Sequence, residues 1–162
     1  MKKVLILLTG ILCLGFTSPN KPLTKQALWK EINQAGIQYP DLVFAQALLE
    51  SGDLKSTITR LNKNVFGMKL PSIRSTTAIG QKRGHALFTH WTESVKDYKL
   101  YQEFVFKKKN ITSRKAYIRY LNKVYSEVND YSKRLSRVLL EHKLLIQEYE
   151  ERKVLQEAYT SN

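Results

Sequence analysis

Apolar residues recur at helical spacing through most of this 162-residue chain, and the spacing is interrupted in one region, between residues 64 and 91. The chain holds only 4 prolines and 7 glycines, so few residues oppose helix formation. Helical periodicity with one short interruption predicts a mainly helical (mainly α, α+β) domain that carries a small β-hairpin insert. The length suits a single domain, since domains commonly contain about 100–150 residues.

Five helices are predicted from capping and stop residues. Thr24 caps the first helix, which ends near Gly36, and Pro40 begins the second, which ends near Gly52. The other three helices are expected to begin at capping residues, namely Thr92, Ser113 and Asp130. The last of them is expected to continue as one helix through Tyr149.

The interruption has the pattern of two short strands. Thr76, Thr77 and Ile79 form a run that favours β-structure, and apolar residues resume at positions 86–88. The polar segment 80–84, which begins and ends with glycine, separates the two runs. We therefore expect a hairpin whose strands contain these runs and whose turn is the polar segment.

Residues 1–17 are predicted to be a secretory signal peptide. Two lysines precede an apolar run over residues 4–14, and small residues at positions 15 and 17 provide a cleavage site. The run is shorter than the about 20 apolar residues of a membrane-spanning helix. We therefore expect export to the periplasm or the cell exterior, with no stable membrane span after the signal is removed. A retained N-terminal anchor is the alternative.

The chain is strongly basic, with a formal net charge of +13 from 27 Lys and Arg against 14 Asp and Glu. Between Lys107 and Arg137, ten basic residues accompany two acidic ones. For an exported protein this charge favours anionic polymers of the cell envelope as partners, rather than nucleic acid. A solvated helical face explains the same residues equally well.

Neither a metal nor a cofactor is expected. The single cysteine, Cys13, excludes an internal disulfide and cysteine-rich metal sites. The chain has three histidines without the spacing of a zinc motif, and they are His85, His90 and His142. It also lacks the nucleophile-elbow motif of a serine hydrolase.

One carboxylate differs from the others in its surroundings. Glu50 follows the mostly apolar residues 45–49, at the C-terminal end of the second predicted helix. The negative end of the helix dipole and apolar neighbours both raise the pKa of a carboxyl group. A general acid that works at neutral pH needs a raised pKa. From this pattern alone, an ordinary glutamate at a helix end is the simpler interpretation.

Several motifs favour the interpretation of Glu50 as a catalytic residue. Residues 45–52 read Ala-Gln-Ala-Leu-Leu-Glu-Ser-Gly, and residues 62–69 read Asn-Lys-Asn-Val-Phe-Gly-Met-Lys. With segments 83–98 and 125–131, they resemble the glucosaminidase family, glycoside hydrolase family 73, in a version nearest to those of Bacteroidetes. The resemblance covers about residues 24–145. It implies a lysozyme-like domain over residues 18–145, followed by a charged helical C-terminal extension over residues 146–162.

The resemblance also implies an activity and roles for individual residues. Members of the family cleave the β-1,4 bond after N-acetylglucosamine in the glycan strands of peptidoglycan. Glu50 matches the catalytic acid of the family, and Tyr125 matches its late functional tyrosine. The residues expected to bind substrate are Asn64, Phe66, Gly67, His85 and Tyr131.

The chain departs from the family at one point that concerns the mechanism. Most glycosidases use two carboxylates, and the family often places the second in the hairpin. Here no Asp or Glu occurs between Asp53 and Glu93. We therefore expect the 2-acetamido group of the substrate to supply the missing group, while Glu50 protonates the leaving oxygen and Tyr125 orients the acetamido group. Two alternatives stay open: a muramidase or lytic transglycosylase of the same fold, and a non-catalytic cell-wall-binding protein.

Overall fold

The computed structural model describes residues 21–125 and 130–160. The predicted signal peptide and Cys13 lie outside these residues, as do positions 126–129 of the late motif. Within the described ranges, no helix has both the length and the apolar composition that crossing a bilayer requires.

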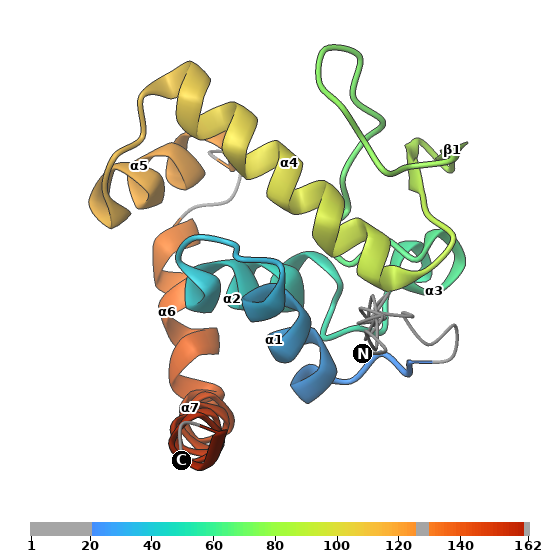
Figure 1. Ribbon diagram of the computed structural model, residues 1–162. Coiled ribbons are helices and arrows are strands. Elements are labelled where there is room, and N and C mark those ends of the chain that lie inside the picture. Colours follow the sequence, from blue (N-terminus) through green and yellow to red (C-terminus); the bar gives the residue numbers. More distant parts are fainter. Residues whose placement is uncertain (1–20, 126–129, 161–162) are drawn as a thin grey trace, which may run out of the picture.

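The described part of the chain is mainly helical, as the sequence predicts, and it contains one small antiparallel sheet. The elements are α1 (Lys25–Gln34), α2 (Pro40–Glu50), α3 (Thr57–Asn62), β1 (Gly80–Lys82), β2 (His85–Leu87), α4 (Trp91–Lys109), α5 (Arg114–Val124), α6 (Tyr131–Glu141) and α7 (Lys143–Thr160). In Figure 1, α4 runs diagonally across the molecule above α1 and α2, while α6 descends on the left towards α7.

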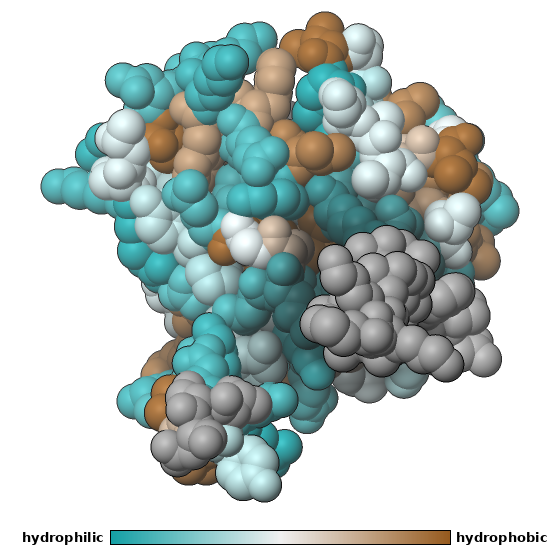
Figure 2. Space-filling view, viewed as in Figure 1, coloured by the Kyte–Doolittle hydropathy of each residue, from teal (hydrophilic) through white to brown (hydrophobic). Residues whose placement is uncertain are grey.

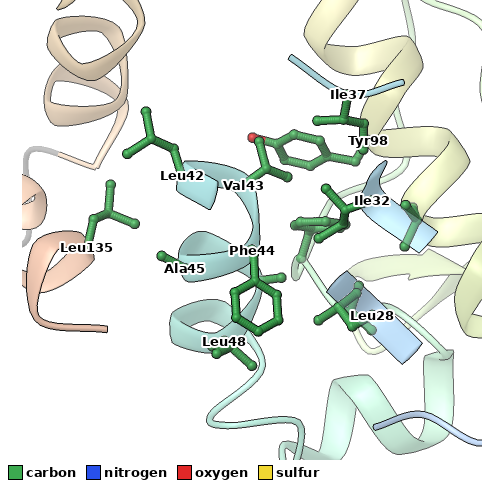
Figure 3. Packing of buried hydrophobic residues seen from close by; sticks show 14 of the residues in the cluster. Leu28, Ile32, Ile37, Leu42, Val43, Phe44, Ala45, Leu48, Tyr98 and Leu135 are labelled. Carbon is green, nitrogen blue, oxygen red and sulfur yellow. The ribbon is translucent and has the colours of Figure 1, made fainter. Parts of the chain in front are cut away.

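Helix α2 forms the centre of the core. Its sequence, PDLVFAQALLE, is apolar on nearly every side, and such a helix is stable only where neighbours surround it. Figure 3 shows α2 between Leu28 and Ile32 of α1 on one side and Leu135 of α6 on the other. Because α2 is enclosed in this way, its last residue, Glu50, has a fixed position.

The helix starts are mostly those that the sequence predicts. Thr24 and Ser113 cap α1 and α5, where each hydroxyl accepts a hydrogen bond from a backbone N–H three residues later. The predicted start of α4 at Thr92 is wrong. His90 occupies the N-cap position and its ring nitrogen accepts from the Thr92 N–H. The same imidazole and the Trp91 indole both contact the Lys21 carbonyl, and these tertiary contacts set the start of the helix.

The single helix predicted over residues 130–149 is also wrong, because the structure has two helices there. Helix α6 ends at Glu141, and His142 separates it from α7. The bend allows Tyr149 of α7 to pack edge-on against Trp29, with ring centroids 6.0 Å apart. The part of α7 that contacts the core therefore extends past residue 145. Asp130 precedes α6, but its side chain makes no capping hydrogen bond.

The hairpin is present, with shorter strands than predicted. Gly80 pairs with Leu87 and Lys82 pairs with His85, so the predicted turn segment 80–84 contains β1 itself. The turn is the two-residue Arg83-Gly84, with φ angles of 54° and 73°. Two successive positive φ angles match the tight hairpin turns that suit the twist of β-strands.

Thr76 and Thr77 lie outside β1, in the long loop between α3 and β1, so their predicted place in a strand is wrong. Thr77 is held by α4 instead: its hydroxyl donates to the Glu93 carbonyl at 2.7 Å, and its N–H donates to the Asp97 carboxylate at 3.1 Å. The loop rises above α4 in Figure 1.

Candidate active site

A cleft of about 750 Å³ lies between the long loop, α4 and α5. Figure 2 shows a largely hydrophilic face, with hydrophobic surface gathered at the tip of the loop and over the hairpin. The described residues that line the cleft are Glu50, Phe66, Gly67, Met68, Lys69, Leu70, Pro71, Ser72, Ile73, Arg74, Tyr98, Tyr101, Phe104, Val105, Lys108, Lys109, Tyr120, Val124 and Tyr125. Glu50 is the only carboxylate among them. No cluster of three or more potential metal ligands occurs in the ranges 21–125 and 130–160.

A strained turn ends α2 directly after Glu50. The buried Ser51 accepts a hydrogen bond from the Leu54 N–H at 2.9 Å. Gly52, Asp53 and Leu54 have φ angles of 55°, 55° and 68°. Left-handed conformations are unfavourable for residues with a Cβ, and they persist where the surrounding structure imposes them. The turn therefore holds the end of α2, and with it the carboxylate, in one position at the cleft.

Burial and one hydrogen bond set the protonation of Glu50. Burial raises its pKa, and the hydrogen bond from Tyr131 and the charge of Arg134 oppose that effect in part. The Tyr131 hydroxyl donates to the Glu50 Oε1 atom at 3.0 Å. The negative end of the α2 dipole acts in the same direction as burial. The net effect favours the protonated carboxyl, which is the form that a general acid uses.

Two tyrosines stack beside this carboxylate. The rings of Tyr125 and Tyr131 lie 4.3 Å apart and 5° from parallel. Burial, followed by the charge of Glu50, raises the pKa of both phenols above the ordinary tyrosine range. Both therefore stay protonated at neutral pH, and each has a proton to donate. The structure thus brings together three predicted site residues, although Tyr125 and Tyr131 lie 75 and 81 positions after Glu50 in the sequence.

Gln46 orients the Tyr125 hydroxyl from inside the core. It lies one turn before Glu50 on α2, is almost fully buried, and donates from Nε2 to the Tyr125 oxygen at 2.8 Å. Its Oε1 accepts from Tyr98 at 2.5 Å, so the proton between Tyr98 and Tyr117 comes from Tyr117. Because the Tyr125 oxygen accepts from Gln46, its own proton points elsewhere, and no described residue accepts it. The hydroxyl can therefore donate into the cleft.

Asn64 stabilises the loop through buried hydrogen bonds to its backbone. It is 1% exposed and does not line the cleft. Its Oδ1 accepts from the N–H groups of Phe66 and Met68 at 3.3 and 3.1 Å, and its Nδ2 donates to the carbonyls of Met68 and Ala86. These bonds shape the turn that presents Phe66 and Gly67 to the cleft. Contact of Asn64 with substrate stays a prediction.

Phe66 forms part of the cleft floor. It is 3% exposed and stacks on Tyr98, with ring centroids 4.1 Å apart. Phe66 therefore packs in the core and lines the cleft at the same time. Gly67 follows with a φ of 62°, which permits the turn of the loop at this point.

His85 is not brought to the cleft. It lies in β2, its Nδ1 atom is 2.8 Å from the Arg83 carbonyl oxygen, and it is absent from the lining of the cleft that contains Glu50. Its contact with substrate stays a prediction that the cleft geometry does not favour.

An ion pair that the sequence did not predict anchors the cleft loop. Arg74 binds both carboxylate oxygens of Asp97, at 3.0 and 2.8 Å, and the Asp97 side chain is fully buried. The Arg74 guanidinium also lies 5.7 Å from the Tyr101 ring centroid. The sequence holds one indication of this pair: Asp97 directly precedes the core residue Tyr98, and a buried charge without a partner would be costly.

Comparisons with known proteins agree with this architecture. A family model described as Glucosaminidase, mannosyl-glycoprotein endo-beta-N-acetylglucosaminidase, matches residues 25–144. Among solved structures, the catalytic domain of the autolysin Auto from Listeria monocytogenes superposes with a TM-score of 0.52 and 20% sequence identity, over 77% of this chain and 88% of that chain. This likeness shows a shared fold. No curated protein sequence matches the chain.

Proposed function

This chain belongs to the glucosaminidase family, and from that premise we propose that it is an exported peptidoglycan hydrolase that cleaves the β-1,4 bond after N-acetylglucosamine. The observation that carries the proposal is Glu50, a carboxyl with a raised pKa that lines a cleft of about 750 Å³. The fold shared with an autolysin catalytic domain supports peptidoglycan as the substrate. Export rests on the signal peptide predicted for residues 1–17.

Glu50 is the general acid in this proposal. Its proton passes to the glycosidic oxygen as the bond from that oxygen to the anomeric carbon breaks, and the leaving sugar departs as an alcohol. The carboxylate that results accepts the hydrogen bond of Tyr131, so the ionised form is stabilised as it appears. Tyr131 is therefore a positioning residue that acts through Glu50.

The substrate supplies the second group. Since Glu50 is the only carboxylate among the described lining residues, the 2-acetamido oxygen attacks the anomeric carbon and forms a cyclic oxazolinium ion. Water then adds to that carbon, gives its proton to the Glu50 carboxylate and opens the ring. Tyr125 donates a hydrogen bond to the acetamido group, keeps its own proton, and holds that group in line for the attack. Two displacements at one carbon give retention of configuration, and an inverted first product would contradict this route.

Substitution of the acid tests the proposal. Glu50→Gln keeps the shape of the side chain and an acceptor for Tyr131 but cannot donate the proton of the carboxyl. We expect clearing of purified peptidoglycan by residues 18–162 to be lost in this variant, while co-sedimentation with the wall persists. Glu141→Gln, the same change at an exposed position of α6 outside the cleft, is the matched control and should clear the wall normally.

Two results would contradict the proposal. Clearing that survives in Glu50→Gln would remove Glu50 from the reaction. A wild-type protein that binds the wall and never clears it would favour the non-catalytic wall-binding protein.

A further inference from the structure

Three lysines at the cleft have no carboxylate partner. Lys69 lies on the long loop, and Lys108 and Lys109 lie in the last turn of α4, so the charges come from two walls of the cleft. All three are exposed, and none forms an ion pair with a described residue. The ammonium group of Lys108 lies 5.3 Å from the centroid of the Phe104 ring.

Two other lysines of the same helix, nearer its start, are paired. Lys96 binds Glu93 at 2.7 Å, and Lys99 lies 3.4 Å from Glu103. Cations in the last turn of a helix are favoured by its dipole, which accounts for the presence of lysines at the end of α4. The dipole does not account for Lys69, which lies on the loop and lines the same cleft. Positive charge that two elements bring to one cleft, and that has no carboxylate partner among the described residues, suits a negatively charged ligand there.

The proposed substrate carries such charge next to the cleavable bond. In peptidoglycan, N-acetylglucosamine alternates with N-acetylmuramic acid, whose lactyl group bears a short peptide with free carboxylates. A strand bound near Glu50 therefore places a stem peptide within one sugar of the reacting bond. Apolar side chains at the same mouth of the cleft, Leu70 and Ile73, offer a surface for the aliphatic parts of that peptide.

We infer that Lys69, Lys108 and Lys109 bind the carboxylates of the stem peptides, so that the enzyme prefers glycan that carries peptides over glycan stripped of them. The inference rests on the proposed function. Exposed ion pairs are individually weak and are screened by salt, so the effect belongs to the three charges together and is largest at low ionic strength.

The test compares two triple variants on two substrates. One variant replaces Lys69, Lys108 and Lys109 with Gln. The matched control makes the same change in charge at exposed lysines that do not line the cleft, which are Lys30, Lys115 and Lys143. The substrates are peptide-bearing peptidoglycan and the same glycan after an amidase has removed its peptides, each at low and high salt.

We expect the wild-type protein to have the higher kcat/KM on the peptide-bearing glycan. The cleft triple variant should lose about tenfold of that preference at low salt, and the control triple variant should keep it. Equal effects of the two variants would overturn the inference, because net charge alone would then explain them. A cleft triple variant whose kcat/KM falls equally on both substrates would also overturn the inference.

Binding separates this inference from the proposed function. In a Glu50→Gln background, co-sedimentation with each glycan measures the preference without turnover. If the wild-type protein cleaves neither glycan, the proposed function fails. If it cleaves both and the Glu50→Gln protein binds them equally, the lysine inference alone fails.

Discussion

Glu50 combines partial burial with a carboxyl group that can carry charge, and this combination has a cost. Its pKa is raised in the folded state, mainly by burial, so the folded protein holds the proton more tightly than the unfolded chain does. The stability that this proton provides is fully present below the unfolded pKa and is lost as the pH rises through the folded pKa. The residue that suits proton donation therefore destabilises the fold at higher pH.

Glu50→Gln removes this pH dependence, because glutamine has no charge to bury. We expect the variant to become more stable relative to the wild type as the pH rises from about 4 to about 8. Thermal unfolding of both proteins across that range measures the difference in Tm. A difference that stays constant with pH would show that the environment of Glu50 does not favour its protonated form.

Gln46 should matter for turnover more than for substrate binding. Gln46→Met keeps the approximate volume and removes the donor to Tyr125, so the Tyr125 proton is no longer directed into the cleft. We expect kcat to fall by about tenfold or more, with a small change in KM. Tyr98→Phe is the control, because it removes the other bond of Gln46 and leaves the Tyr125 contact in place. An equal loss of kcat in both variants would assign the effect to core packing.

At the level of elements, locally determined features were predictable. Thr24 and Ser113 cap helices because a hydroxyl reaches its own first turn, which is a property of a few adjacent residues. The start of α4 and the bend at His142 depend on contacts with α1 and the N-terminal segment, which no local pattern contains.

Residues of the candidate site also differ in whether the sequence predicts them. Glu50 and Tyr125 were found through motifs that resemble a family. The role of Gln46 was not predicted, because its partner Tyr125 lies 79 positions away. The ion pair between Arg74 and Asp97 was not predicted either, because these residues lie 23 positions apart. Such partners become visible only when the elements are packed.

The ion pair between Arg74 and Asp97 should stabilise the cleft loop as an element. Asp97→Ala leaves the guanidinium without its partner, and loss of one member of a buried pair costs roughly 3–5 kcal/mol. We expect denaturant unfolding to show a loss of about 3–5 kcal/mol, since the Arg74 side chain is only 8% exposed and would keep its charge without a carboxylate partner. The double variant Arg74→Met, Asp97→Leu should recover part of it. A loss below about 1 kcal/mol in Asp97→Ala would contradict a stabilising role of the pair.

At the scale of the whole molecule, α7 joins a packed first part to an exposed second part. Tyr149 contacts Trp29 of α1, whereas residues 151–159 are all exposed. A chain that ends after Arg152 should unfold at the Tm of the full chain. A chain that ends after Leu145 loses an aromatic contact of roughly 1 kcal/mol and should unfold about 2–8 °C lower. Equal Tm values for both truncations would place the end of the stable domain at residue 145.

The new reducing end identifies the bond that the protein cleaves. Purified peptidoglycan is digested with residues 18–162, the soluble products are reduced with borohydride, and their masses are determined. We expect reduced N-acetylglucosamine at the new ends, and none from the Glu50→Gln variant. Reduced N-acetylmuramic acid, or its 1,6-anhydro form, would contradict the proposed bond specificity and assign the cleft to a muramidase or a lytic transglycosylase.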